Sequence, residues 1–211
     1  MYRIQFCIVT EKPLTRRRAE TRQRLLDAAL EAFAEQGYGA TSVEQVCARA
    51  NFTRGAFYSN FDSLDELFLA MWEQRSAQLL HDLEELLAAP DEANLATLRD
   101  AVAHVADAVP VDDEWYRVTA EFTAHALRNP ILKQVVAARE DAILATLLPL
   151  LDRLMATVGR RITDRDALGH ALVAAHDGTT VQCLIEDDQQ AARTRRTDLF
   201  TVLVEHYTEE I

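Results

Sequence analysis

The segment NFTRGAFYSNF, residues 51–61, concentrates polar groups that can contact a nucleic acid. An arginine such as Arg54 can donate two hydrogen bonds to the edge of a guanine in the major groove. The hydroxyl of Thr53 and the amide of Asn60 can donate to base edges or phosphate oxygens. Four aromatic residues lie among them, namely Phe52, Phe57, Tyr58 and Phe61. The segment therefore combines a contacting surface with an apolar anchor.

A helix-turn-helix accounts for this mixture. Thr41 or Ser42 can cap a short helix whose Val43, Val46, Cys47 and Ala50 follow helical spacing. Glu44 or Gln45 follows at the spacing of a capping box. Asn51 then stands at the turn, where a positive φ is often required and asparagine tolerates it.

The second helix of this unit, capped by Thr53, must face two ways. Phe57 faces the core with Phe61 one turn on, while Thr53, Arg54 and Gly55 keep the N-terminal end polar or small for a groove. A short amphipathic helix can thus be anchor and contact surface at once.

The rest of the chain shows apolar residues at helical period and no alternating strand pattern. We expect nine helices, at about 15–35, 42–50, 53–58, 63–89, 92–108, 113–128, 131–158, 164–186 and 193–209. Asn129 and Pro130 fit an N-cap followed by proline at the first helical position. Pro149 should kink its helix, because proline removes one backbone donor and crowds the preceding turn.

A first helix ending in a glycine–tyrosine turn is followed by Thr-Ser-Val and then by ANFTRGAFYSNF. From about Arg18 to Leu67 this order resembles the TetR family of bacterial transcriptional repressors. The residues that match the family pattern are Gly37, Tyr38, Thr41, Val43, Ala50, Gly55, Tyr58 and Phe61. Two positions depart from it. Asn51 replaces the usual glycine, and Leu64 stands where a phosphate-contacting lysine is common, so binding would rest more on the arginines near residues 16–24.

The resemblance implies an all-α fold with three domains or segments. Residues 1–14 would be a flexible extension, 15–62 a three-helix DNA-binding domain, and 63–211 a six-helix ligand-binding and dimerisation domain. It implies DNA contacts at Arg16, Arg17, Arg18, Thr41, Ser42, Thr53, Arg54, Gly55, Tyr58, Ser59 and Asn60. Arg54 and Thr53 would read bases, while the other polar groups and the arginine run would hold the DNA backbone or reach an adjacent minor groove.

We expect a dimer, because two-fold symmetry doubles the DNA contacts that one helix-turn-helix makes. The last two helices are the expected interface, since Ala171, Ala174 and Gly178 allow close helix approach and the resemblance implies a four-helix bundle between two copies, with packing inside one chain as the alternative. The interface residues would be Ala171, Ala174, Gly178, Leu199, Phe200, Leu203 and Tyr207. The resemblance also implies an effector pocket in the middle helices, lined by Trp115, Phe122, His125, Leu148, Met155, His176 and Thr179. The expected partners are a double-stranded DNA operator, a small-molecule effector and a second copy of the chain.

Charge is spread unevenly along the chain. Residues 1–60 hold nine basic and six acidic residues, a net charge of +3, whereas residues 61–211 hold 13 and 28, a net charge of −15. A basic unit attached to an acidic body fits a nucleic-acid partner despite the overall charge of −12. The start lacks a signal-peptide pattern and no apolar run is long enough to span a membrane, so we expect a cytoplasmic protein.

Two other classes of protein share features with this sequence. A small metal-dependent helical enzyme could use the acidic runs 111–115 or 185–190, but no convergent ligand motif accompanies either run, so we expect no catalysis, metal or cofactor. An interaction module without DNA binding would need the acidity and Leu64 to abolish affinity. Cys7, Cys47 and Cys183 show no zinc or disulfide spacing and could be redox-sensitive or buried and inert.

Overall fold

The computed structural model describes residues 16–88 and 97–211, and these residues are helical over most of their length. They contain nine α-helices, one 3-10 turn and two three-residue strands. The chain divides into two compact units between Met71 and Trp72, inside helix α4 (Leu64–Ala88). The expected all-α fold of about nine helices is confirmed.

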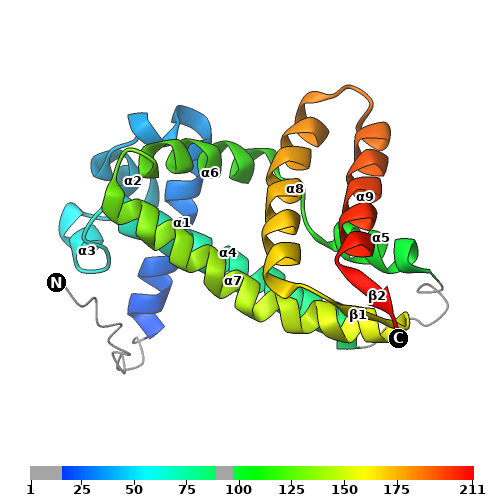
Figure 1. The fold of residues 1–211 in the computed structure, drawn as a ribbon. Coiled ribbons are helices and arrows are strands. Elements are labelled where there is room, and N and C mark those ends of the chain that lie inside the picture. The colour runs from blue at the N-terminus through cyan, green and yellow to red at the C-terminus, as the bar shows by residue number, and fades with distance from the viewer. Residues whose placement is uncertain (1–15, 89–96) are drawn as a thin grey trace. The chain divides into compact units, whose positions relative to one another are not determined.

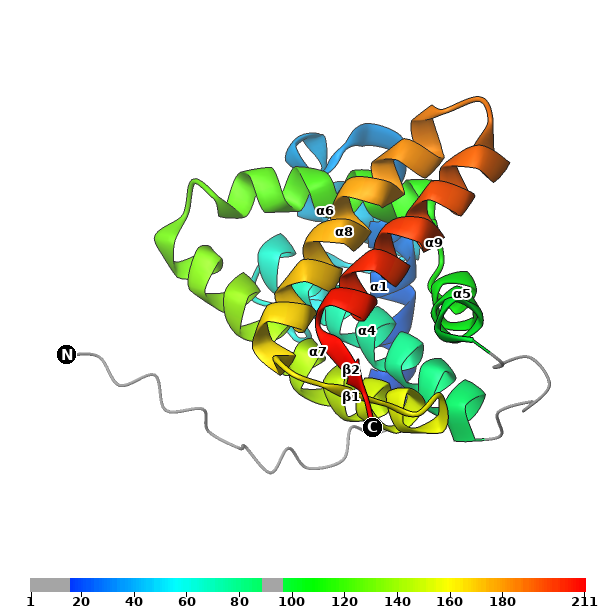
Figure 2. The same ribbon diagram turned by 45° about the vertical axis from the view of Figure 1, so that its right-hand side comes forward.

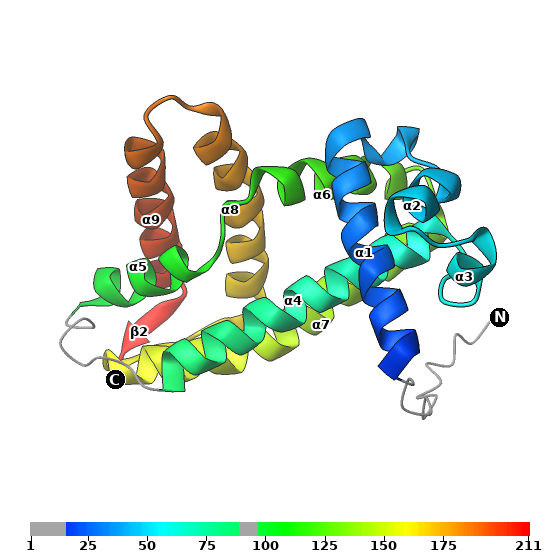
Figure 3. The ribbon, with the colours of Figure 1, turned by 180° about the vertical axis from the view of Figure 1, so that it is seen from behind.

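The first unit is built from α1 (Arg16–Gln36), the turn η1 (Tyr38–Ala40), α2 (Val43–Ala50), α3 (Arg54–Tyr58) and the start of α4 (Figure 3). Its apolar stripe on α1 meets the buried faces of the short helices. The side chains with the least exposure are Leu25, Ala29, Ala32, Phe33, Val46, Phe57, Phe61, Leu67 and Phe68. This core packs α2 and α3 against α1.

The second unit contains α5 (Leu98–Ala108), α6 (Asp113–Ala126), α7 (Pro130–Thr157), α8 (Arg165–Ile185) and α9 (Gln189–His206). Helices α8 and α9 form an antiparallel pair, and the later part of α4 runs along α7 (Figures 1 and 2). One core cluster joins four of these helices, with Ala101, Val102, Leu154, Met155, Leu168, Ala175, Phe200 and Val204 buried together.

Two strands correct the sequence-based expectation of a chain without strands. β1 (Arg160–Ile162) pairs antiparallel with β2 (Thr208–Glu210), and two flanking hydrogen bonds, Thr163 N to Tyr207 O at 2.8 Å and Ile211 N to Gly159 O at 2.9 Å, extend the pairing. Three residues are too few to show an alternating pattern, and their partners lie far away in sequence.

Both ends of α9 differ from the expected positions. α9 begins at Gln189 rather than near residue 193, because Asp188 accepts a hydrogen bond from Ala191 N at 3.0 Å and caps it. It ends at His206 rather than 209, because residues 208–210 pair with β1. The expected Asn129 cap with Pro130 at the first position is confirmed. The expected extension 1–14 and helix start near 92 lie outside the described residues.

Candidate nucleic-acid interface

The first helix of the helix-turn-helix starts and stops as its sequence predicts. Ser42 N donates to the Gln45 side chain at 2.7 Å, and Gln45 N donates back to Ser42 Oγ at 3.3 Å, which completes a capping box. After Ala50, Asn51 adopts the left-handed conformation, with φ 57° and ψ 46°. The chain therefore turns at the residue that tolerates this backbone.

The second helix, α3, is held by its apolar face. Thr53 caps it by accepting from Ala56 N at 3.2 Å. Phe57 and Phe61 are 0% and 1% exposed, and their ring centroids lie 5.9 Å apart. The predicted core role of both phenylalanines is confirmed. This anchoring leaves the opposite face of α3 in solvent.

That exposed face carries the predicted base-reading groups. Thr53, Arg54, Gly55 and Ser59 are exposed, and Tyr58 is 48% exposed despite its size. Arg54 lies on α3 next to α2, where its Nη1 is 2.9 Å from an oxygen of Glu44. The arginine predicted to read bases is thus paired with an acidic side chain. The sequence offered Glu44 as one of two candidates for the capping box, a role that Gln45 fills, and did not predict its contact with Arg54.

The two residues before α2 are used inside the fold. Thr41 is buried, and its hydroxyl donates to Gly37 O at 2.8 Å, with Ala32 O at 3.4 Å. Its single hydroxyl proton is therefore engaged within the unit. Ser42 Oγ serves the capping box, so the groups of this segment that face outward are mainly backbone N–H groups of the α2 N-terminus.

The arginines of α1 have distinct surroundings. Arg16 pairs with Glu20 at 2.9 Å, and Arg17 is exposed. Arg18 donates to Ser59 O at 3.0 Å and lies 3.4 Å from the Asn60 side-chain oxygen. A polar pocket of about 260 Å³ joins the start of α1 to the end of α3, lined by Arg18, Arg22, Tyr58, Ser59, Asn60, Phe61, Asp62 and Glu66. The Ser59 hydroxyl and the Asn60 amide both donate to Ala56 O, at 2.9 and 2.8 Å, so they are engaged within the fold. The Arg18 guanidinium and the Tyr58 hydroxyl are the lining groups better suited to a phosphate oxygen.

Comparisons with known proteins match both units. Residues 25–71 match the model for bacterial regulatory proteins of the tetR family. Residues 94–206, more than half of the chain, match the C-terminal model of BetI-type transcriptional repressors. The chain belongs to the TetR family. Members of this family are transcriptional regulators, and the resemblance stated from the sequence is confirmed.

Individual relatives resemble this TetR-family chain over about half of their length. It is 35% identical over 107 residues to the HTH-type transcriptional regulator AcrR of Shigella flexneri, covering 50% of this chain and 49% of that protein. It is 32% identical over 123 residues to the HTH-type transcriptional activator FasR of Mycolicibacterium smegmatis, covering 58% and 55%. A solved structure of FadR from Bacillus subtilis with stearoyl-CoA has a similar fold, with a TM-score of 0.63 and 19% identity over 86% of this chain and 97% of FadR.

The residues expected to line an effector pocket lie in the second unit of the TetR-family chain, but in different surroundings. Phe122 is fully buried, Met155 belongs to the core cluster that contains Phe200, and Leu148 belongs to a second cluster with Leu144 and Leu151. Trp115 lies beneath Arg75, whose Cζ is 4.7 Å from the ring centroid. His125 and Trp115 are half-buried. The lining therefore stays a prediction.

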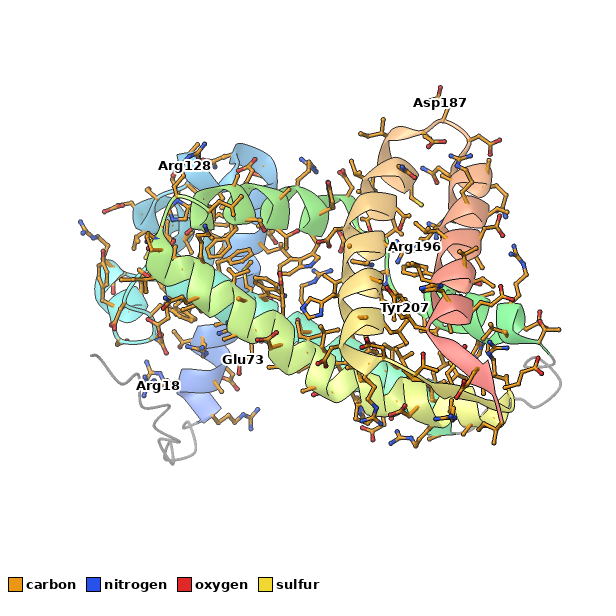
Figure 4. All side chains as sticks on the ribbon, in the orientation of Figure 1. Arg18, Glu73, Arg128, Asp187, Arg196 and Tyr207 are labelled. Atoms are coloured by element: carbon orange, nitrogen blue, oxygen red, sulfur yellow. The ribbon has the colours of Figure 1, made fainter. Side chains whose placement is uncertain are left out.

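Two further residues of that expected lining, His176 and Thr179, lie on α8, and His176 meets a buried arginine. Arg196 of α9 is 3% exposed and points between the helices, with Nη1 3.0 Å from Thr180 Oγ1 and Nη2 3.1 Å from His176 Nδ1 (Figure 4). Burial, with the Arg196 charge, lowers the pKa of His176 to about 4. The Thr179 hydroxyl donates to Ala175 O at 2.6 Å.

The expected dimer residues divide into two groups. Ala174, Gly178 and Leu199 are exposed on the α8–α9 pair, together with Val202 and Ile185. Phe200 is only 9% exposed in the core of its own chain, and Leu203 and Tyr207 pack partly against the same core, while Ala171 is half-buried. Phe200 therefore offers little surface to a second copy.

The acidic runs have structural tasks. Asp112 accepts from Trp115 N at 3.0 Å and from Arg75 at 2.5 Å. Burial alone would raise the pKa of Asp112, but these two donors together lower it below its ordinary value. In the other run, Asp188 caps α9 and Glu186 pairs with Arg195. Helix capping and ion pairing thus account for these carboxylates.

Both cysteines within the described residues are buried. Burial, followed by the nearby Glu44 carboxylate, raises the pKa of the Cys47 thiol, which lowers its reactivity. Cys183 is also buried and reduced. Within the described residues, no helix combines the length and apolarity needed to cross a membrane.

Proposed function

We propose that this TetR-family chain is a ligand-responsive repressor that binds a palindromic operator as a homodimer and leaves it when a small-molecule effector binds. The observation that carries the proposal is the exposed polar face of α3, with Thr53 and Arg54 at its start and Phe57 anchored behind them. A helix held this way can enter a major groove and present an arginine to guanine.

In this proposal the two parts of the chain have different roles. Residues 15–62 form the DNA-binding domain, and residues 63–211 bind the effector and pair two copies. The exposed apolar side chains Leu199, Val202 and Ile185 on the α8–α9 pair support pairing there. Two-fold symmetry then places two α3 helices on successive half-sites about one helical turn apart.

DNA binding is tested by fluorescence anisotropy with the region upstream of the chain's own gene. Arg54→Ala should weaken specific binding by about 1–3 kcal/mol, because a bidentate base contact is lost. Tyr58→Phe should cost about 1 kcal/mol through one lost hydrogen bond. Lys133→Ala, which removes one exposed charge from α7, serves as the control. Equal affinity for the operator in all four proteins would contradict the assignment.

Effector response needs a separate measurement. Ligands that raise the melting temperature of the chain, beginning with stearoyl-CoA because FadR has a similar fold and binds it, are added to the preformed operator complex. Release by a stabilising ligand supports the proposal, because that ligand shifts the population away from the DNA-binding state. Unchanged operator affinity with every stabilising ligand contradicts it. A reporter gene distinguishes repression from the activation named for FasR.

A further inference from the structure

Two arginines of α1 grip the ends of the two helices that form the helix-turn-helix. The last carbonyls of any helix lack partners within that helix and need other donors. Arg24 Nη2 donates to Ala50 O, at the end of α2, at 2.7 Å. Arg22 Nη1 donates to Asn60 O, just after α3, at 3.1 Å.

Each guanidinium also stacks on the aromatic ring that follows the carbonyl it binds. The Arg24 Cζ lies 4.5 Å from the centroid of the Phe52 ring, and the Arg22 Cζ lies 4.3 Å from that of Phe61. A cation at the C-terminal end of a helix is also favoured by the helix dipole. The same combination of a carbonyl hydrogen bond and a stacked ring thus occurs twice, once at the end of α2 and once just after α3.

The spacing of the two arginines explains how one turn of α1 can hold both helices. Residues two apart in a helix project in nearly opposite directions. Arg22 therefore reaches α3 while Arg24 reaches α2 from the same turn. Arg18, one turn before Arg22, adds a hydrogen bond to Ser59 O at 3.0 Å.

We propose that Arg22 and Arg24 are positioning residues that set the orientation of α3 and α2 for reading DNA, and that they are not phosphate contacts. This inference rests on the proposed DNA-binding function. Their donors and flat faces point at the protein's own carbonyls and rings. A small rotation of α3 would move Arg54 away from its base. Loss of the Arg22 or Arg24 contacts should therefore reduce the preference for operator over other DNA.

The test compares Arg22→Met, Arg24→Met and Arg17→Met in the full chain. Methionine keeps an unbranched stem and the helix propensity of arginine but loses the charge and the donors. Arg17 is exposed on the same helix and is one of the predicted DNA contacts. Its variant is therefore the control for hydrogen exchange and the phosphate-contact reference for operator binding. Amide hydrogen exchange of the free protein is measured first. We expect exchange to accelerate about fivefold or more in α3 for Arg22→Met and in α2 for Arg24→Met, with no change for Arg17→Met.

Operator binding is then measured at several salt concentrations. Loss of a positioning residue should weaken operator binding on the order of tenfold and leave non-specific binding and the salt dependence unchanged. Loss of a phosphate contact would instead lower the slope of log K against log salt by about 0.9 and weaken all sequences alike. That second result, with unchanged exchange, overturns the inference.

The parent protein could bind no operator, or a methionine variant could fail to fold, and each result has its own interpretation. If the parent protein binds no operator, the proposed function fails, whereas the exchange measurement still decides whether the arginines hold α2 and α3. If a methionine variant does not fold, Arg22→Lys and Arg24→Lys replace it. Lysine keeps the charge but not the flat guanidinium, so operator discrimination should fall partly while the salt slope stays constant. Full discrimination with lysine overturns the stacking role.

Discussion

At the scale of single residues, Arg54 is already paired when DNA arrives. Glu44 holds its guanidinium at 2.9 Å, and both side chains are exposed, so the pair is weak and easily exchanged. We expect a guanine edge, which offers two acceptors to one guanidinium, to displace this exposed carboxylate. We also expect the Glu44 charge to repel phosphates of any sequence and so to weaken non-specific DNA binding.

We predict that Glu44→Gln raises affinity for non-specific DNA about threefold or more, because it removes a competing negative charge near the DNA. Operator affinity should rise less, so the specificity ratio falls. Anisotropy with operator and scrambled duplexes at one salt concentration measures both values. An unchanged ratio would show that the Glu44 contact does not influence base reading.

Residue roles set by local backbone could be predicted from the sequence, and those set by long side chains could not. Asn51 and the Ser42–Gln45 capping box depend on neighbours within three residues, and both are found as expected. Arg22 and Arg24 reach carbonyls 38 and 26 residues away. Helical spacing shows only that Arg22 and Arg24 lie outside the apolar stripe of α1. It does not show which carbonyl groups they bind.

At the scale of elements, the turn between α2 and α3 depends on one backbone conformation. We predict that Asn51→Ala destabilises the chain by about 1 kcal/mol, because alanine is strained in the left-handed region. Asn51→Gly should leave stability nearly unchanged. Chemical denaturation measures both. Equal destabilisation by the two substitutions would indicate that the Asn51 side chain, rather than its φ angle, matters.

Helices with clear periodicity were predicted well, while pairings between distant segments were missed. The spans of α2, α3 and α8 differ from expectation by one residue or so at each end. The β1–β2 pair was missed because its partners, Arg160 and Glu210, are 50 positions apart. The start of α9 was misplaced although Asp188 offered a readable N-cap.

At the scale of the whole molecule, stability should depend on pH through His176. Its pKa is near 4 in the folded chain and 6.5 otherwise, so the unfolded chain binds a proton first as pH falls. The folded state therefore loses stability between about pH 6.5 and pH 4, by up to about 3 kcal/mol.

Urea unfolding at pH 7.5 and pH 4.5 checks this prediction, with His176→Gln as the comparison. Other titrating groups cancel in the difference between the two proteins. The parent should lose about 2–3 kcal/mol more than the variant over this range. The same loss in both proteins would place the pH dependence elsewhere.

The pairing of β1 with β2 makes the α8–α9 segment a closed loop of chain. The segment enters at Arg160 and leaves at Glu210, and these two residues lie opposite each other in the strand pair. Residues 160–210 therefore form a segment whose two ends are adjacent, which suits its exchange as one cassette by recombination. Exchange of this cassette between related regulators would change the surface proposed to select a dimer partner while leaving the DNA-reading unit intact, a simple way for duplicated genes to stop forming mixed dimers.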